Sequence, residues 1–550
     1  MFLRIFVIAA TNSIILFSQI TLSDHLLIST NLIIIIVWNC PVLCKKVFIL
    51  YNYVIDTQIT HFTFTGRANI VLNLNRIFYL LSLSELIFLR YNLYSENCMV
   101  KFSKAFWVAN SVELLERLAY YGVFIVITLY LSNVWGFSDI EAGLISGTFS
   151  ACLYLLPTFV GALADKIGFR TSIMLAFLLL TLGYGGLGLL PTLLESAGLV
   201  HYEMTTTFTG LESSYLRWSI VPVLLLIVVG GSFIKAVISG TVARETSSET
   251  RARGYALFYM MVNIGAFLGK TVVDPLRKSM GDEGLVYLNF FAASMTLLAL
   301  IIVAILYKSV KTEGKGKSFA EIGRGLLKVM SNVRLLVLIL IISGFWMIQS
   351  QMYATMPKYV IRMIGEDASP GWYANVNPLV VFVLVNFITS WMKKRKALTS
   401  MTIGMLIIPL SALVMSLGTQ VGSDSILGLH PVAFMMIVGI AMQAVAECFI
   451  SPRFLEYFSL QSPKGEEGLY LGFSHLHSFF SYLFAFGLSG FLLDKYCPDP
   501  RTFASAEAYA TATQHAHYIW YVFVGIGLIS AVALLVYGYV TRKADSRKVA

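Results

Sequence analysis

The chain has 550 residues, of which 57% are hydrophobic and 13% charged, and its mean hydropathy is +0.75. Soluble domains average about 45–50% apolar and about 25% charged residues, so this composition excludes a string of soluble domains. The formal net charge of +10 lies in short polar connections, without a basic patch that interleaves aromatic residues, and it therefore does not indicate nucleic-acid binding.

Apolar stretches of about 20 residues, the length that a helix needs to cross a bilayer core, recur beyond residue 105. Short polar breaks separate them. The pattern predicts an all-α integral membrane protein with twelve transmembrane helices, near 105–131, 140–163, 171–191, 218–240, 255–274, 286–307, 335–356, 374–392, 398–418, 431–450, 470–493 and 517–540.

Residues 1–98 are a doubtful hydrophobic extension. Their apolar runs, such as 32–38 and 78–89, are short and interrupted by polar residues, and Met99 precedes the regular pattern. Two interpretations compete: additional N-terminal helices, or sequence upstream of a functional start near Met99. The second is favoured, and we expect the extension to be dispensable. It also lacks the ordered basic region, apolar core and cleavage site of a secretory signal.

Positive charge alternates along the connections between the predicted helices. One set of alternating connections holds most of the basic residues: Lys166 and Arg170, then Arg244, Arg251 and Arg253, then those of 308–334 and 393–396, then Arg542. Because Lys- and Arg-rich loops stay in the cytoplasm, both ends of the twelve-helix body are predicted to be cytoplasmic, in a multi-pass protein of the plasma or inner membrane.

The long middle connection predicts two six-helix bundles, 99–307 and 335–542. Residues 308–334 would form a cytoplasmic linker, amphipathic at its end, and 543–550 a cytoplasmic tail. Residues 161–170 read Gly-Ala-Leu-Ala-Asp-Lys-Ile-Gly-Phe-Arg, which resembles the GxLaDrxGrR loop of the major facilitator superfamily. A plain glycine turn with positive-inside residues is the alternative interpretation of this loop.

The first predicted span carries charge, which costs about 2.5–3.5 kcal/mol per ionisable residue at the middle of a membrane helix. Its polar side chains form one stripe at i, i+3, i+4, i+7 and i+8: Glu113, Glu116, Arg117, Tyr120 and Tyr121. Polar residues in later spans are Lys235, Asn263, Gln349, Gln351, Asn377, Glu447, His475 and His477. Any one of them could join helices by a hydrogen bond, but the set indicates a solute pathway.

Two motifs resemble the proton-dependent oligopeptide transporters, a branch of the major facilitator superfamily. Residues 113–122, Glu-Leu-Leu-Glu-Arg-Leu-Ala-Tyr-Tyr-Gly, match the most characteristic positions of the ExxERFxYYG motif, and 258–265 resemble FYxxINxG. Shorter matches are Lys235 after Gly-Gly-Ser-Phe-Ile, the 345–351 segment, Asn377 in an NPL, and Glu447 in a segment similar to GExxxSP. The resemblance covers about residues 105–540.

The resemblance implies a peptide pocket between the bundles. Arg117 and Lys235 would hold the substrate carboxylate and Glu447 the substrate amino group. The remaining implied substrate-binding residues are Tyr120, Tyr121, Asn263, Trp346 and Asn377. Separated charges of opposite sign suit a zwitterionic peptide, because ion pairs are stronger in a cavity of low dielectric constant.

Proton coupling is expected at Glu113, Glu116 and Arg117, because protonation of one carboxylate would release the guanidinium. The chain departs from the family at Ser350, where many relatives have an acidic residue. Phe124 stands where an arginine is expected, and the tryptophan of the eleventh span is replaced around 474–475. His475 and His477 are further candidates for proton transfer, or they pack helices together.

The sequence thus predicts a proton-coupled symporter of di- and tripeptides that works by alternating access, is monomeric and needs no cofactor. The alternative is a carrier for another small organic or amino-acid-like solute; a non-transporting receptor is disfavoured. An enzyme is not predicted, since the sequence has no HExxH, no GxSxG and no phosphate loop ending in GK[ST]. Six scattered cysteines give neither a disulfide framework nor a metal pattern.

Overall fold

A computed structural model of the chain describes residues 102–200, 215–247, 250–308, 319–422, 425–461 and 473–549. Helices dominate these ranges, together with one isolated β-bridge between Ile426 and Leu429. The extension 1–98, to which the two competing interpretations refer, lies outside the described residues.

The helices follow one another with short connections in both halves of the chain. The first half contains α5 Lys104–Phe124, α6 Ile127–Asn133, α7 Asp139–Leu155, α8 Pro157–Ile167, α9 Phe169–Ser196, η1 Leu216–Ser219, α10 Ile220–Arg244, α11 Arg251–Met280 and α12 Asp282–Leu306. The connection and second half contain α13 Phe319–Met330, α14 Val333–Gln349, α15 Gln351–Ala354, α16 Met356–Ile364, α17 Pro370–Ala374, α18 Val376–Met392, α19 Ala397–Ser416, η2 Leu417–Thr419, α20 Pro431–Gln461, α22 Leu476–Tyr496, η3 Pro500–Thr502, α23 Ala506–Thr513 and α24 Tyr518–Val549.

Local sequence fixes where several of these helices begin. Ser103 caps α5 by accepting from the Phe106 amide. Ser138 and Glu141 form a reciprocal capping box at the start of α7, which satisfies amides that would otherwise lack a partner. Gly168 separates α8 from α9 with φ of +85°, a conformation that residues with a side chain rarely adopt.

Ten helices in the described ranges are long and apolar enough to span a membrane, or eleven if α5 and α6, bent by 47°, form one span. The predicted all-α membrane-embedded class is confirmed, but two predicted spans are divided, 105–131 between α5 and α6 and 140–163 between α7 and α8. Residues 140–163 fall on α7, with 17 residues, and α8, with 11. Pro157 begins α8, and a proline lacks the amide that would bond back into the preceding turn.

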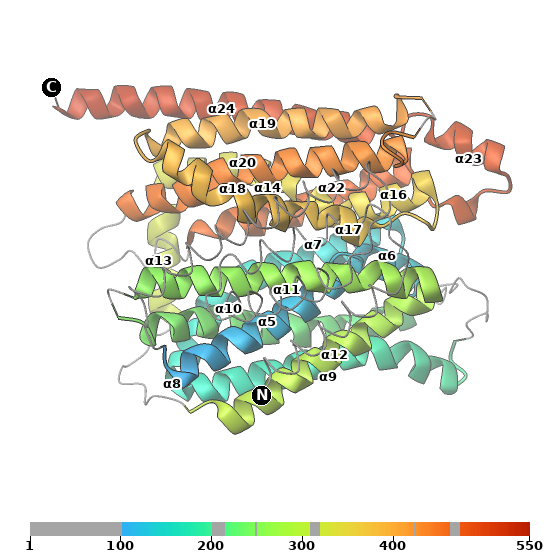
Figure 1. The fold of residues 1–550 in the computed structure, drawn as a ribbon, viewed down its shortest axis with the longest axis horizontal. Helices are drawn as coiled ribbons and strands as arrows, with labels where there is room; N and C mark the ends of the chain where they lie inside the picture. The colour runs from blue at the N-terminus through green and yellow to red at the C-terminus, as the bar shows by residue number, and fades with distance from the viewer. Residues whose placement is uncertain are drawn as a thin grey trace, which may run out of the picture. The chain divides into compact units, whose positions relative to one another are not determined.

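Helices of each half pack mainly on one another. In the first half, α5 packs on α11 and α12, and α9 on α10 and α12; in the second, α19 packs on α20 and α24, and α18 on α20. Figure 1 shows the two groups of helices, and the halves meet through α7 with α22 and through α11 with α17 and α18. The bundle boundaries at 308 and 334 stay predictions.

Glycines allow α7 and α22 to approach closely. A Cβ added at Gly143 would lie 2.4 Å from the Phe486 carbonyl oxygen, and one at Gly490 would lie 2.3 Å from the Asp139 carbonyl oxygen. Both obstructing atoms belong to backbone and cannot rotate away. Small residues are the usual means of close helix contact in membranes, where packing rather than the hydrophobic effect drives association.

Substitution of Gly490→Ala is expected to lower the melting temperature of the purified protein, because the new methyl group forces α22 away from α7. Overpacking of this kind costs about 1–3 kcal/mol. Gly487→Ala on the same helix is the matched control, since its added Cβ would meet only the Leu144 Cδ2 atom at 3.2 Å, the end of a flexible side chain. Equal melting temperatures for the two variants would contradict the prediction.

Candidate functional site

The charged stripe of α5 forms an ion-pair triad. Arg117 Nε lies 3.2 Å from Glu113 Oε1, and Arg117 Nη2 lies 2.5 Å from Glu116 Oε2. All three residues are buried, with Glu116 only 1% exposed. The predicted pair of Glu113 and Arg117 is therefore present. Because two carboxylates share one guanidinium, the triad carries a formal charge of −1 when both are ionised.

Aromatic rings lie beside both Arg117 and Lys235. The Arg117 guanidinium lies 5.3 Å from the centre of the Tyr120 ring, which packs edge-on against Tyr121 at 5.1 Å. Lys235 is half-buried in α10; its Nζ lies 3.6 Å from the Tyr154 ring centre and 3.3 Å from the Leu153 carbonyl oxygen. Cations are stabilised over aromatic faces, so the rings keep both cations in place inside the bundle.

The second half contributes Glu447 of α20. Gln349 of α14 and Asn377 of α18 donate to the same carboxylate oxygen, Oε2, at 2.9 and 3.1 Å. In the described part of the chain, no hydrogen bond reaches Oε1. The carboxylate is thus fixed by three helices and keeps one oxygen for a ligand. The sequence had singled out Gln349 only as a polar residue in an apolar span.

Glu447 interacts electrostatically with Tyr121 of α5 and with Lys270 of α11. Lys235 interacts in the same way with Arg117, Glu116 and Glu113. The charges of α5 and Lys235 therefore interact within the first half, and Glu447 of the second half interacts with Lys270 and Tyr121 of the first.

Other predicted residues lie in different surroundings. His477 is 5% exposed, stacks on Trp346 with ring centres 5.4 Å apart and pairs with the Ser478 hydroxyl, whereas His475 is exposed. Asn263 donates to the Tyr259 carbonyl one turn earlier in its own helix. The structure thus brings His477 to Trp346, and the roles proposed for both histidines stay predictions.

Sequence reasoning missed Lys270, a fully buried lysine in α11. It falls within the predicted span 255–274, and a charge inside a membrane helix was the signal that could have identified it. Asp274 and Arg277 follow at i+4 and i+7, on the same helix face. No group of three or more His, Cys, Asp or Glu side chains in the described ranges is arranged to hold a metal ion.

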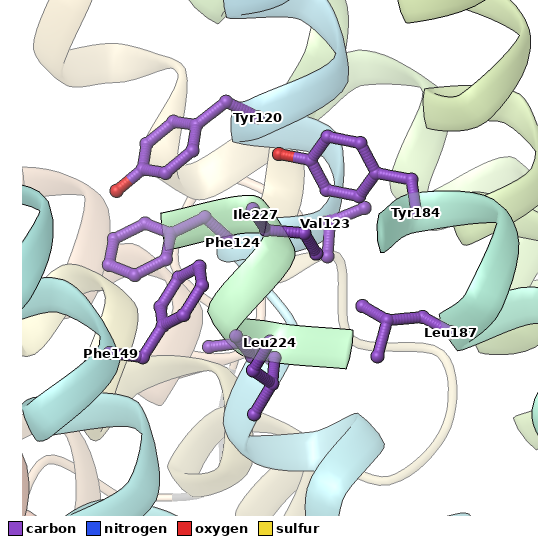
Figure 2. A pocket seen from close by; sticks show the side chains of 9 residues that line it. Tyr120, Val123, Phe124, Phe149, Tyr184, Leu187, Leu224 and Ile227 are labelled. Carbon is purple, nitrogen blue, oxygen red and sulfur yellow. The ribbon is translucent and has the colours of Figure 1, made fainter. Parts of the chain in front are cut away.

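A small apolar cavity lies beneath Tyr120, inside the first half of the chain. Figure 2 shows Tyr120 and Tyr184 above side chains from α7 and α10, and aliphatic or phenylalanine residues supply the remaining lining. Of the predicted substrate-binding residues, only Tyr120 lines this cavity. Its walls offer no charge, so this cavity by itself provides no site for a charged peptide terminus.

A second ionic cluster joins the halves at the start of α7. Asp139 Oδ1 accepts from Lys358 Nζ at 2.6 Å, and Asp139 Oδ2 accepts from Arg362 Nη1 at 2.6 Å. Arg362 also donates to the Cys497 carbonyl. Burial alone would raise the pKa of Asp139, but the two cations hold this pKa well below its usual range. This cluster lies just before the predicted span 140–163 and holds α7 against α16.

The amino-acid sequence matches the family described as Major Facilitator Superfamily over residues 111–427. The chain belongs to the major facilitator superfamily. The match begins within α5 and crosses the middle connection into the second half, so both halves of this superfamily member take part in it.

Curated relatives are dipeptide and tripeptide permeases. The permease A of Salmonella typhi is 29% identical over 294 residues, 51% of this chain and 52% of the permease. The permease A of Escherichia coli strain K12 is 28% identical over 276 residues, 48% of this chain and 49% of the permease. This superfamily member spans about half the length of the curated relatives it matches.

Solved structures share the fold. A proton-dependent oligopeptide transporter superposes with a TM-score of 0.59 at 18% identity, covering 80% of this chain and 98% of that one. A peptide transporter in complex with sulfate gives 0.61 at 17% identity, covering 81% and 96%. The predicted fold class is confirmed, and the chain is similar to proteins of the oligopeptide transporter branch, as the motifs indicated. Membership of the major facilitator superfamily agrees with the prediction that the protein is not an enzyme.

Replacement of Arg117 by methionine is expected to cost about 3–5 kcal/mol of folding free energy, because it leaves two buried carboxylates without a counter-ion. The triple variant Glu113→Gln, Glu116→Gln, Arg117→Met removes all three charges and is expected to recover much of this loss. Thermal unfolding of both purified variants measures the difference. A triple variant as unstable as Arg117→Met would mean that the charges do not depend on one another.

The ionic cluster predicts a pH dependence of stability. Because the folded-state pKa of Asp139 is lowered, its stabilisation is complete above the unfolded pKa of about 3.9 and is lost as the pH falls below that value towards the folded pKa. Asp139→Asn is therefore expected to be less stable than the parent at pH 7, with a gap that narrows below about pH 4. Melting temperatures from pH 3 to pH 7 test this, and a constant gap would contradict it.

Proposed function

We propose that the chain is a proton-coupled carrier of di- and tripeptides that works by alternating access. The observation that carries the proposal is the separation of charge: the Arg117 triad on α5 and Lys235 on α10 belong to one half, and Glu447 belongs to the other. A peptide zwitterion needs this arrangement, with its carboxylate at the cations and its ammonium group at the carboxylate. The names of the curated relatives and solved structures support the same substrate class.

The ammonium group of the peptide would bind Glu447 at Oε1, while Gln349 and Asn377 keep Oε2 in place. A carboxylate held in advance by two amides binds a ligand at a lower entropic cost than a mobile one. The peptide carboxylate would bind Arg117 and Lys235, with Tyr120 and Tyr121 forming the walls. Asn263, Trp346 and Asn377 would complete the pocket.

Proton coupling would begin at the α5 triad. Protonation of Glu113 or Glu116 removes one of the two negative charges around Arg117. The guanidinium can then form an ion pair with the peptide carboxylate. Binding of the proton therefore favours binding of the peptide, and the reverse must hold to the same degree. The driving force is the proton gradient, and no cofactor is required.

Alternating access would open and close the contacts between the halves. The Asp139 cluster and the α7–α22 glycine contact hold the halves together at the end where α7 begins, which the distribution of basic loops assigns to the outer side of the plasma or inner membrane. Both ends of the helical body would then be cytoplasmic, and one chain suffices for the pathway.

The double variant Glu113→Gln, Glu116→Gln is expected to exchange labelled dipeptide across proteoliposomes that contain peptide on both sides, at a rate similar to the parent. The same variant should fail to accumulate dipeptide when only a pH gradient is imposed, because the sites for the proton are gone. Glu283→Gln, at an exposed position of α12, is the matched control and should behave as the parent.

Accumulation at the parental level in the double variant would contradict the assignment of the proton site, and His475 and His477 would then be tested. Loss of exchange as well, at normal folding, would assign the two glutamates to substrate binding. If the parent takes up no dipeptide but does take up a free amino acid or another small organic solute, the alternative substrate class replaces the proposal.

A further inference from the structure

Lys270 is a buried lysine that forms no close ion pair with a carboxylate among the described residues, although Glu447 acts on it from a longer distance. It is 1% exposed, and its Nζ donates to the Ala374 carbonyl oxygen at 3.3 Å. The same atom lies 5.3 Å from the ring centre of Tyr121 and 5.4 Å from that of Tyr353. The ion pairs of the described chain involve other cations.

These neighbours stabilise an ammonium group only in part. Removal of an ion from water costs several kcal/mol even after the protein relaxes. The hydrogen bond from Lys270 Nζ to the neutral Ala374 carbonyl is 3.3 Å long, which exceeds the usual range of about 2.7–3.2 Å. Aromatic faces contribute about 2 kcal/mol at best. An anionic ligand group would therefore bind Lys270 more strongly than the Ala374 carbonyl does.

The formal charges of the site lead to the same conclusion. Three carboxylates, Glu113, Glu116 and Glu447, balance three cations, Arg117, Lys235 and Lys270. One bound proton brings the net charge of the site to +1. A zwitterionic dipeptide with uncharged side chains adds no net charge, so the net charge stays at +1. A peptide with one acidic side chain returns the loaded site to zero, which a medium of low dielectric constant favours.

We propose that Lys270 is a specificity residue that binds the side-chain carboxylate of peptides containing aspartate or glutamate. The inference rests on the proposed peptide transport and names a substrate class within it. Tyr121 connects Lys270 with the proposed carboxylate site, because Lys270 Nζ lies 5.3 Å from the Tyr121 ring centre and Tyr121 packs against Tyr120, whose ring lies beside Arg117. An acidic side chain of a peptide bound against Tyr121 would therefore lie near Lys270.

Other contacts between α11 and the second half do not depend on Lys270. The Trp372 amide donates to Asp274 Oδ2 at 2.9 Å, Asn375 donates to the Thr271 hydroxyl at 2.9 Å, and Arg277 pairs with Glu366 at 2.5 Å. A variant at Lys270 thus retains the contact between α11 and α17, and a change in substrate preference can be separated from a loss of packing.

The test compares Ala-Glu with Ala-Gln, which differ in charge and hardly in shape, as competitors of labelled Ala-Ala uptake at pH 7 in proteoliposomes. For the parent, we expect Ala-Glu to compete about tenfold more strongly than Ala-Gln, as one charge-assisted hydrogen bond would give. Lys270→Met should abolish this ratio and keep competition by Ala-Gln. Lys270→Arg should preserve the ratio, and Lys278→Met, at an exposed position of the same helix, should behave as the parent.

If Ala-Glu and Ala-Gln compete equally well for uptake by the parent protein, the inference is overturned, whether or not Lys270→Met folds. If Lys270→Met weakens competition by Ala-Glu and by Ala-Gln equally, so that their ratio is unchanged, the inference is also overturned and the lysine is assigned to packing. Absence of any Ala-Ala uptake by the parent overturns the proposed function itself, which is a distinct result from uptake without preference for the acidic peptide.

Discussion

A charge inside a membrane helix is tolerated only with a partner, and the pairing of Arg117 with Glu113 and Glu116 meets this requirement within a single helix. The rest of the site is arranged around that pairing. Because α5 supplies its own counter-ions, Arg117 does not need a carboxylate from the second half. The two halves are then free to hold opposite charges that face a ligand instead of neutralising each other.

In the second half, neutral side-chain amides rather than a counter-ion stabilise the charge. Gln349 and Asn377 stabilise the Glu447 carboxylate through two hydrogen bonds and leave its charge intact. A cation in their place would neutralise Glu447 and compete with a substrate ammonium group. The contacts that join the halves, at Asp139 and at the glycines of α7 and α22, lie apart from these charges. In the proposed mechanism, the contacts between the halves can change while each charged group keeps its local partners.

Much of the fold was predictable because apolar segments of bilayer length are a strong signal, and the i, i+4 spacing of Glu113 and Arg117 fixes their contact in any helix. The pair of Glu116 with Arg117 was less accessible, since neighbours in sequence point apart on a helix and only a long arginine folds back. The division at Pro157 was missed because hydropathy remains high across it. Asp139 and Lys358 are 219 positions apart, and no local pattern identifies such partners.

The departure at Ser350 gains a physical meaning from these contacts. Its hydroxyl donates to the Met347 carbonyl within the last turn of α14, and it brings no charge to the site. An acidic residue there would add a negative charge to the end of α14 in the second half. Without it, the counter-ions of Arg117 on the described chain are those of α5 alone. Proton binding at α5 would then act on the affinity for the peptide first, and the halves would move in response to the loaded ligand, whose two ends bind different halves.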